Sequence, residues 1–258
     1  MKVASSTIIE RASSLLSSQE ARDSAVYFSA SSLQAGVAFA LLPVLTRFLT
    51  PADYGIVANY NSLFELACLL VALSTSGLVL RNYYFFTEER LSRNITTALA
   101  LVAVAGALLS GLLSLLGGTI HRFLSIPPFW LLLIPVLAIA RVVLQTALVI
   151  FQCEKKPKSY ALLQISESTL ILLVSVVLVV LFGFAWEGRI IGLTLGTLLA
   201  GVGGGLILRS RGLLVLRRAS FTRKEVGVVL RWGLPLIPHA VGGWVLTLSD
   251  RVLISSLC

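Results

Sequence analysis

The amino-acid sequence is poor in charged residues. Asp, Glu, Lys and Arg together make up 13% of its 258 residues, whereas a soluble globular domain carries about a quarter. Hydrophobic residues make up 57%, and the mean hydropathy is +0.92. So little charge cannot cover a water-facing surface, and so much apolar content excludes a disordered chain. The composition therefore predicts a polytopic membrane protein.

Cysteine is also scarce, and several catalytic motifs are missing. The three cysteines, Cys68, Cys153 and Cys258, form no spaced pair, which excludes a disulfide scaffold. No Gly-Lys dipeptide occurs, so the sequence contains no phosphate-binding loop with which to hydrolyse ATP. His-Glu-x-x-His, Cys-x-x-Cys and Asp-x-Asp are absent as well. We therefore expect no enzyme activity, no bound metal and no cofactor.

Several apolar stretches are long enough to cross a bilayer, whose core of about 30 Å needs roughly 20 residues of α-helix. They lie near residues 26–48, 56–80, 95–116, 129–151, 161–184, 190–208 and 227–258. After the first stretch, Thr50 is placed to cap a helix that begins with Pro51 and carries Asp53 at its third position. The sequence thus predicts an all-α polytopic membrane bundle of about seven transmembrane helices.

The basic residues are unevenly distributed between the two sides of this predicted topology. Sixteen of the 21 Lys and Arg residues lie in the N-terminal segment and in alternate connections, whereas the other side holds Arg47, Arg122 and Arg189. Cytoplasmic loops retain such an excess of cations, so we predict a cytoplasmic N-terminus. The net charge of +9 is then a consequence of topology, and nucleic acid is not an expected partner.

The polar interruptions divide the chain into four predicted parts. Residues 1–25 form a cytoplasmic, interfacial amphipathic segment, and residues 26–208 form a six-helix N-terminal lobe. Residues 209–226 form a basic cytoplasmic linker. Residues 227–258 form the first helix of an incomplete second lobe, because apolar residues run up to Cys258 with no polar cap or basic stop after them.

Charged side chains at membrane depth cost about 2.5–3.5 kcal/mol on insertion scales, so each needs a partner or a wet cavity. Arg141 lies near the middle of the fourth predicted helix, with Gln145 on the same face. We predict that these two residues line a cavity, although a structural ion pair of Arg141 with Glu65 or Glu167 explains the pattern too. Glu65 and Glu167 could each carry a coupling proton if burial raised their pKa values, or serve as structural partners.

The seventh predicted helix combines prolines with polar residues. Pro235 and Pro238 remove backbone donors and loosen the helix. His239 and Asp250 share one of its faces, and Arg251 points to a different neighbour. We predict that these three side chains line a transport path, whereas the alternative for Asp250 and Arg251 is anchoring at the outer headgroups.

Small residues at helical spacing predict close packing between helices. One stripe consists of Gly192, Gly196, Ala200 and Gly204, and another consists of Ala103, Ala107 and Gly111. The aromatic run at residues 83–86 follows Arg81 and predicts a belt at the membrane interface.

Three stretches carry a resemblance to a known family: Leu45-Thr46-Arg47-Phe48-Leu49-Thr50-Pro51-Ala52-Asp53-Tyr54-Gly55, residues 152–160, and residues 231–239 together with Ser249-Asp250-Arg251. They resemble the polysaccharide biosynthesis protein family. This family includes the bacterial O-antigen and capsule-repeat flippases and belongs to the multidrug/oligosaccharidyl-lipid/polysaccharide exporter superfamily.

The resemblance implies two six-helix lobes that alternate access around a central cationic cavity in the bacterial cytoplasmic membrane. The implied cargo is an oligosaccharide on polyprenyl pyrophosphate, moved from the inner to the outer leaflet, with Arg141 and Arg251 as its counter-charges. Other implied partners are membrane lipids and the glycosyltransferases and polymerase of the same pathway. This sequence departs from the pattern by stopping after one helix of the second lobe.

Two alternatives stay open. The chain could be a drug or cation extruder of the same superfamily, in which case the acids Glu65, Glu167 and Asp250 matter more than the arginines. It could also be a truncated helical bundle that inserts into the membrane and transports nothing.

Overall fold

The computed structural model describes residues 19–215 and 222–257, with only the backbone at residues 19, 20, 38 and 247–257. Within these ranges the chain forms helices and connections and no strand. The all-α membrane bundle predicted from composition is therefore confirmed. The interfacial helix predicted near the N-terminus lies almost entirely outside the described residues.

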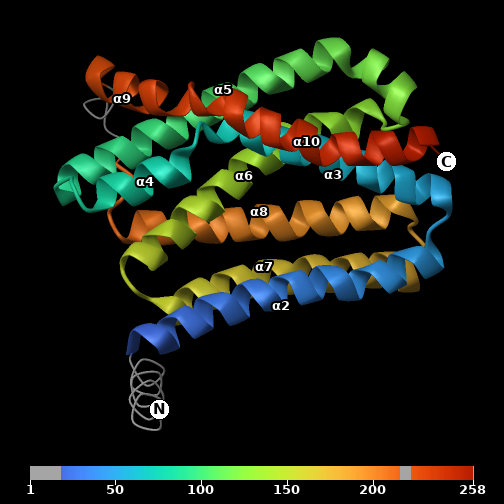
Figure 1. Cartoon of the computed structure of the whole chain (residues 1–258), viewed down its shortest axis with the longest axis horizontal. Helices are drawn as coiled ribbons and strands as arrows, with labels where there is room; N and C mark the ends of the chain where they lie inside the picture. The colour runs from blue at the N-terminus through green and yellow to red at the C-terminus, as the bar shows by residue number, and fades with distance from the viewer. Residues whose placement is uncertain (1–18, 216–221, 258) are drawn as a thin grey trace, which may run out of the picture.

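Six helices of the described chain are long and apolar enough to span a membrane. All the described helices, in chain order, are α2 (Gln19–Phe48), α3 (Pro51–Ala72), α4 (Thr75–Tyr83), α5 (Glu88–Leu124), α6 (Pro128–Cys153), α7 (Pro157–Val176), which continues as the π-helix η1 (Val177–Leu181), α8 (Trp186–Ser210), α9 (Arg223–Gly233) and α10 (Leu236–Leu257). The six long, apolar helices are α2, α3, α5, α6, α7 and α8. Successive spans run in opposite directions, so the basic connections 81–93, 154–158 and 209–215 lie at one end of the bundle, on the left of Figure 1.

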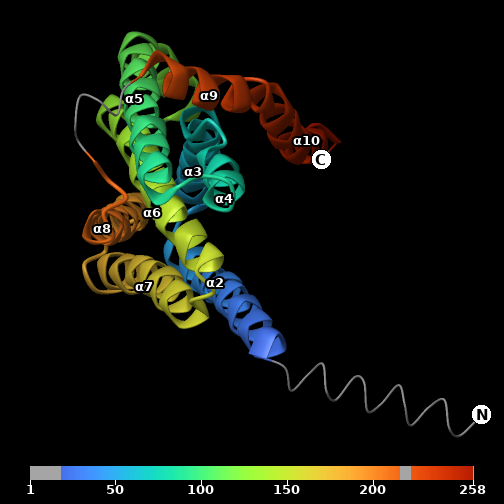
Figure 2. The ribbon, with the colours of Figure 1, turned by 90° about the vertical axis from the view of Figure 1, so that its left-hand side faces the viewer.

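Helix α6 occupies the centre of the bundle. It lies between the group α2, α7 and α8 and the group α3, α4 and α5, as Figure 2 shows from the side. Its residues Leu131, Ile134, Leu137, Ala138 and Val142 are at most 1% exposed and form part of the largest hydrophobic core cluster. The span predicted at 129–151 is therefore the central helix of the bundle, in contact with both groups.

The turn between α2 and α3 forms as its sequence predicts. The backbone N–H of Asp53 donates to Thr50 Oγ1 at 3.2 Å, and the backbone N–H of Thr50 donates to Asp53 Oδ2 at 3.2 Å. This reciprocal capping box satisfies two backbone donors at the start of α3. It sets α3 antiparallel to α2 across a two-residue connection.

The second predicted span is interrupted, which the sequence analysis missed. Leu73 and Ser74 have φ values of 46° and 51°, in the left-handed region, and separate α3 from α4. A Cβ atom at Gly233 would lie 2.5 Å from the carbonyl oxygen of Leu73, so α9 packs directly on this break. The run from Ser74 to Gly77 contains poor helix formers, which was the available sequence signal.

The seventh predicted span is also divided, here in line with its prolines. Helix α9 ends at Gly233, and α10 begins at Leu236, on either side of Leu234 and Pro235. Pro235 has no N–H to donate to a preceding turn. Helix α9 begins within the segment predicted as a linker, and α10 then crosses α3 (Figure 1).

Glycines on α8 allow two neighbouring helices to approach closely. A Cβ at Gly192 or Gly196 would collide with Ser175 or Ile171 of α7, and one at Gly201 or Gly204 would meet Ala140 or Leu144 of α6. Gly192 and Gly196 of the predicted stripe thus allow close contact with α7. Gly201 and Gly204 allow close contact with α6. The stripe on α5 is different, because Ala103, Ala107 and Gly111 are exposed in the described structure.

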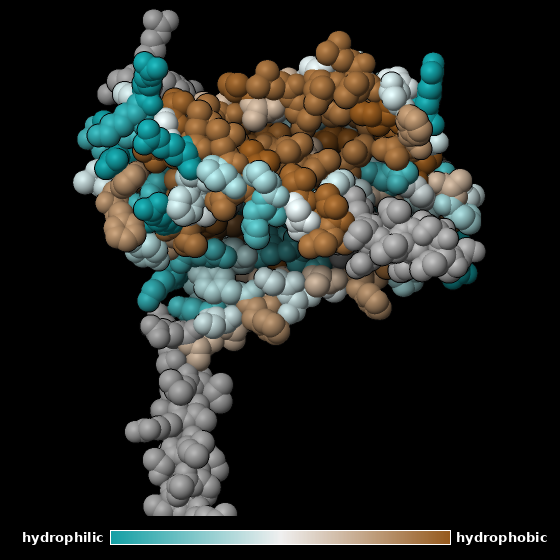
Figure 3. Space-filling view, turned by 45° about the horizontal axis from the view of Figure 1, so that its top comes forward, coloured by the Kyte–Doolittle hydropathy of each residue, from teal (hydrophilic) through white to brown (hydrophobic). Residues whose placement is uncertain are grey.

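The outer surface of the bundle is apolar. Large side chains such as Phe39, Leu108, Leu115, Leu181 and Leu206 are 62–83% exposed. Figure 3 shows this hydrophobic surface over much of one face. Exposure on this scale would aggregate a protein in water, whereas it suits contact with acyl chains.

Glu154 links two connections at the basic end of the bundle, outside the spans. It forms ion pairs with Arg211 and with Lys156, the latter at 3.0 Å from Nζ to Oε2. Burial alone would raise the pKa of Glu154, but the hydrogen bonds and charges of Arg211 and Lys156 outweigh burial and hold the pKa below its usual 4.5. The pairs therefore favour the ionised, folded form.

This shift predicts a pH-dependent contribution to stability. A carboxyl whose pKa is lowered by folding stabilises the protein above its unfolded pKa, and the stabilisation is lost as the pH falls through the folded value. Glu154→Gln should therefore lower the melting temperature of the purified protein at neutral pH, and the difference from wild type should shrink as the pH falls below 4.5 and vanish once the pH is below the lowered, folded pKa. Glu89→Gln is the matched control, because the Glu89 side chain is 85% exposed. A difference that persisted unchanged into acid would contradict the assignment.

Candidate functional site

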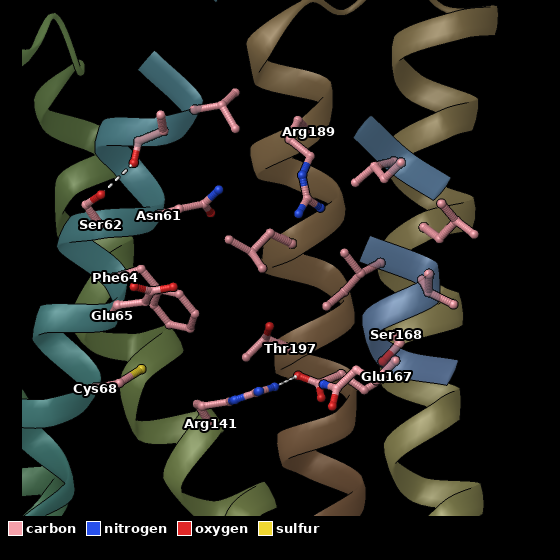
Figure 4. Close-up of a pocket in the computed structure, with 18 of the residues that line it drawn as sticks. Asn61, Ser62, Phe64, Glu65, Cys68, Arg141, Glu167, Ser168, Arg189 and Thr197 are labelled. Atoms are coloured by element: carbon pink, nitrogen blue, oxygen red, sulfur yellow. Dashed lines mark hydrogen bonds and ion pairs between the residues drawn. The ribbon is translucent and has the colours of Figure 1, made fainter. Parts of the chain in front are cut away.

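A cavity of about 1120 Å³ lies between the two groups of helices. Residues of α2, α3, α6, α7, α8 and α10 line it, and Figure 4 shows part of this lining. Its polar and charged lining residues are Gln34, Asn61, Ser62, Glu65, Arg141, Gln145, Glu167, Ser168, Arg189 and Thr197. Four of these, Arg141, Gln145, Glu65 and Glu167, are sequence-predicted candidates that the fold brings together.

Arg141 and Glu167 form an ion pair across the cavity wall. The Nη1 atom of Arg141, on α6, donates to Oε1 of Glu167, on α7 (Figure 4). The Glu167 side chain is 1% exposed and that of Arg141 is 28% exposed. The structure combines the two interpretations left open for Arg141, because Arg141 is ion-paired and its guanidinium also faces the cavity.

The neighbourhood of Glu167 is polar on the same helix face. Ser168 is buried beside it, and the side chain of Gln164, one turn earlier, donates to Gln34 of α2. The contact between Gln164 and Gln34 connects α7 to α2 at the depth of the ion pair.

Glu65 faces the cavity from α3 (Figure 4). It is exposed, and the described residues offer it no hydrogen bond or ion pair. Asn61 and Ser62, one turn earlier on α3, also line the cavity. This wall therefore presents an unpaired carboxylate opposite the Arg141–Glu167 pair.

Arg189 is a cavity residue that the sequence analysis missed. It was counted with the arginines of the outer connections, but it lies one turn inside α8 and extends into the cavity (Figure 4). Its Nη1 donates to Ser175 Oγ at 3.2 Å, and its Nε is buried without a hydrogen-bond partner. Among the described residues, no carboxylate pairs with it. The signal was periodicity, because Arg189, Leu193 and Thr197 recur every four residues and all line the cavity.

Of the candidates on the seventh predicted helix, His239 lies outside this group. His239 is exposed on α10 and does not line the cavity, because the helix turns Ala240 and Trp244 toward it instead. Asp250 and Arg251 belong to α10, but their side chains lie outside the described part of the structure. Their predicted roles stay predictions.

The described residues include no group of three His, Cys, Asp or Glu side chains placed to hold a metal ion. The cavity instead offers two guanidinium groups, two carboxylates, amides and hydroxyls. The fold and this lining define a multi-pass helical membrane protein whose spans surround a polar, charged cavity.

The chain belongs to the polysaccharide biosynthesis protein family, whose sequence model matches residues 21–258. It is 26% identical over 234 residues to Lsg locus putative protein 1 of Haemophilus influenzae, covering 90% of this chain and 56% of that protein. It is also 29% identical over 149 residues to an uncharacterized membrane protein of the same organism, covering 57% of this chain and 34% of that protein. The chain thus spans about half the length of the first of these relatives.

Solved structures share the fold. A MOP superfamily transporter from Pyrococcus furiosus matches with a TM-score of 0.59 at 16% identity, over 84% of this chain and 50% of that one. An outward-facing multidrug resistance MATE family transporter of the MOP superfamily matches with a TM-score of 0.60, also at 16% identity, over 84% and 50%. The described bundle therefore has the fold of about half of such a transporter.

Proposed function

We propose that the chain forms one half of a membrane transporter that moves a polyprenyl-pyrophosphate-linked oligosaccharide from the inner to the outer leaflet by alternating access. The bacterial cytoplasmic membrane is the proposed location. The observation that carries the proposal is Arg189, a cavity arginine that no described carboxylate neutralises. Membership of the polysaccharide biosynthesis protein family supports the nature of the cargo.

The physical reason lies in charge compensation. An arginine in a membrane cavity without an anionic partner is costly, and a pyrophosphate that leaves water needs counter-charge. A guanidinium group presents five N–H donors in a planar fork that matches phosphate oxygens. Arg189 uses one of its nitrogens on Ser175, so a bound anion would satisfy donors that the described residues leave open.

Arg141 gives the anion a second position. Thr197 lies beside the Arg141–Glu167 pair in Figure 4, and eight residues of α8 separate Thr197 from Arg189, which is about 12 Å along the helix axis. The pyrophosphate would replace Glu167 as the ion-pair partner of the Arg141 guanidinium. It would then move to Arg189, which lies nearer the predicted outer end of the bundle. The amides and hydroxyls of Gln34, Asn61 and Gln145 would contact the sugars.

A test uses cells that lack the chromosomal copy and express the intact gene. Arg189→Gln should reduce surface polysaccharide at least about tenfold, because the loss of one charged hydrogen-bonding partner costs 1.5 kcal/mol or more. Arg189→Lys keeps the charge and should retain part of the activity. Arg209→Gln is the matched control, since Arg209 is exposed at the opposite end of α8. Normal surface polymer with Arg189→Gln at wild-type protein level would refute the proposal.

Glu65 favours a second candidate, an extruder of organic cations. It is a cavity carboxylate that pairs with no described residue, and the fold is shared with a multidrug resistance MATE family transporter. In that case Glu65→Gln would abolish ethidium efflux while Arg189→Gln would spare it. Loss of labelled lipid-linked oligosaccharide translocation in proteoliposomes with Arg189→Gln, and no ethidium efflux by wild type, would favour the flippase. A protein that moved neither would be a non-transporting bundle.

A further inference from the structure

A second, smaller cavity lies away from the central one, between α4 and α9. Its volume is about 470 Å³. Both helices lie at the end of the bundle that carries the basic connections (Figure 1), which we predict is cytoplasmic. The lining residues are Leu78, Arg81, Asn82, Phe85, Phe86, Val228, Arg231 and Trp232. None of them lines the central cavity.

Two arginines enter this cavity from different helices. Arg81 lies in the last turn of α4 and Arg231 in the last turn of α9, and both are exposed. The guanidinium carbon of Arg81 lies 4.9 Å from the centroid of the Trp232 ring. Stacking on a ring uses the face of the guanidinium and leaves its N–H edge open to an acceptor.

The acidic side chain of α9 is already paired. Glu225 of α9 is buried, and it accepts from Asn94 at 3.3 Å and pairs with Arg90 at 3.6 Å. The lining itself contains no Asp or Glu. Arg81 and Arg231 therefore present positive charge to the cavity with no acid among its lining residues.

The remaining walls suit a lipid. Leu78 and Val228 are aliphatic, and Phe85 is 79% exposed beside Tyr84, which is 66% exposed. Exposed aromatic side chains next to arginines are typical of the headgroup level of a bilayer. The ring of Trp232 adds a further apolar wall beneath Arg81.

We propose that this cavity binds the phosphate headgroup of an anionic phospholipid, with Arg81 and Arg231 as its ligands and the apolar walls against the glycerol and upper acyl chains. The phosphate would add a second link between α4 and α9 to the Arg81–Trp232 stacking, while α9 also meets α5 through Glu225 and packs its Gly233 on the α3–α4 break. The bound lipid would thus fix α9 to the six-helix part of the bundle. The proposal does not depend on what the central cavity transports.

The test measures lipid binding and not transport. The intact gene product is purified into nanodiscs of phosphatidylcholine with or without phosphatidylglycerol, and native mass spectrometry counts the lipids retained after detergent release. Wild type should retain phosphatidylglycerol in preference to phosphatidylcholine and should melt at a higher temperature in its presence. Arg81→Gln with Arg231→Gln should weaken this retention at least about tenfold, since each surface arginine contributes about 1 kcal/mol to anionic lipid binding.

Matched variants separate a built site from general attraction. Arg93→Gln with Arg209→Gln removes two cations from the same end without touching the cavity, and it should keep the preference. Arg81→Lys with Arg231→Lys should keep part of it and guards against misfolding. Equal loss in both glutamine double variants would overturn the proposal. The proposal would also be overturned if inorganic phosphate displaced phosphatidylglycerol and stabilised the lipid-free protein, because the site would then bind free phosphate.

Discussion

Replacement of Arg141 by glutamine alone is expected to destabilise the protein strongly and to abolish transport. The change leaves the carboxylate of Glu167, 1% exposed, without its cationic partner. Breaking a buried ion pair from one side typically costs about 3–5 kcal/mol, because the remaining charge is uncompensated. The expected results are a lower protein level in membranes and a lower melting temperature in detergent, along with the absence of surface polysaccharide.

The double variant Arg141→Gln with Glu167→Gln separates folding from function. It removes both charges and leaves two amides that can hydrogen-bond across α6 and α7, so protein level and melting temperature should return close to wild type. Surface polysaccharide should stay absent if Arg141 is a counter-charge for the cargo. A double variant that restored both stability and surface polymer would show that the pair is structural only. An unaltered melting temperature for the single variant would contradict the ion pair itself.

Replacement of Gly201 by leucine is expected to prevent the native packing of α8. A Cβ atom at this position would lie 2.7 Å from Cβ and 2.8 Å from the carbonyl oxygen of Ala140, so the clash is with backbone and not with a flexible side-chain end. Overpacking typically costs about 1–3 kcal/mol even where side chains can shift, and here α6 itself would have to move. We expect loss of the monodisperse detergent-solubilised protein and degradation in the membrane.

The chain supplies a matched control two residues away. A Cβ at Gly203 would meet nothing within 4 Å, so Gly203→Leu should insert, fold and elute as wild type does. Both variants add the same apolar side chain to the same helix, which removes hydrophobicity and helix propensity as explanations. Normal elution and melting of Gly201→Leu would contradict the close approach of α8 to α6.

Much of the fold was predictable because a membrane span is a local property. Roughly 20 apolar residues cross a bilayer core whatever their neighbours are, and the Thr50 capping box depends on residues three positions apart. The break at Leu73 and Ser74 was missed for the opposite reason. The two residues of the break are neither proline nor glycine, so the weak helix formers up to Gly77 were the only local signal, and the break coincides with the contact of Gly233 from a distant part of the chain.

The candidate site was predictable only in part. Arg141, Glu65 and Glu167 were found because each is a charge within an apolar stretch. Arg189 was missed because it follows the polar connection near Glu187 and was counted as a loop charge. Such a count does not predict whether a residue at the start of a helix points into the bundle or away from it. His239 was predicted on a polar face of α10, but the packing of that helix turns Ala240 and Trp244 to the cavity.

The sequence by itself determined that this is a helical membrane protein, where most of its long apolar helices lie and which connections are basic, because hydropathy and charge act residue by residue along the chain. Only the tertiary structure decided which charges meet. It paired Arg141 with Glu167, left Arg189 and Glu65 without charged partners in the described cavity, and joined Arg81 and Arg231 around a separate pocket. Such pairings depend on the rotation and approach of helices distant in sequence, which small residues such as Gly201 permit and which no local pattern encodes.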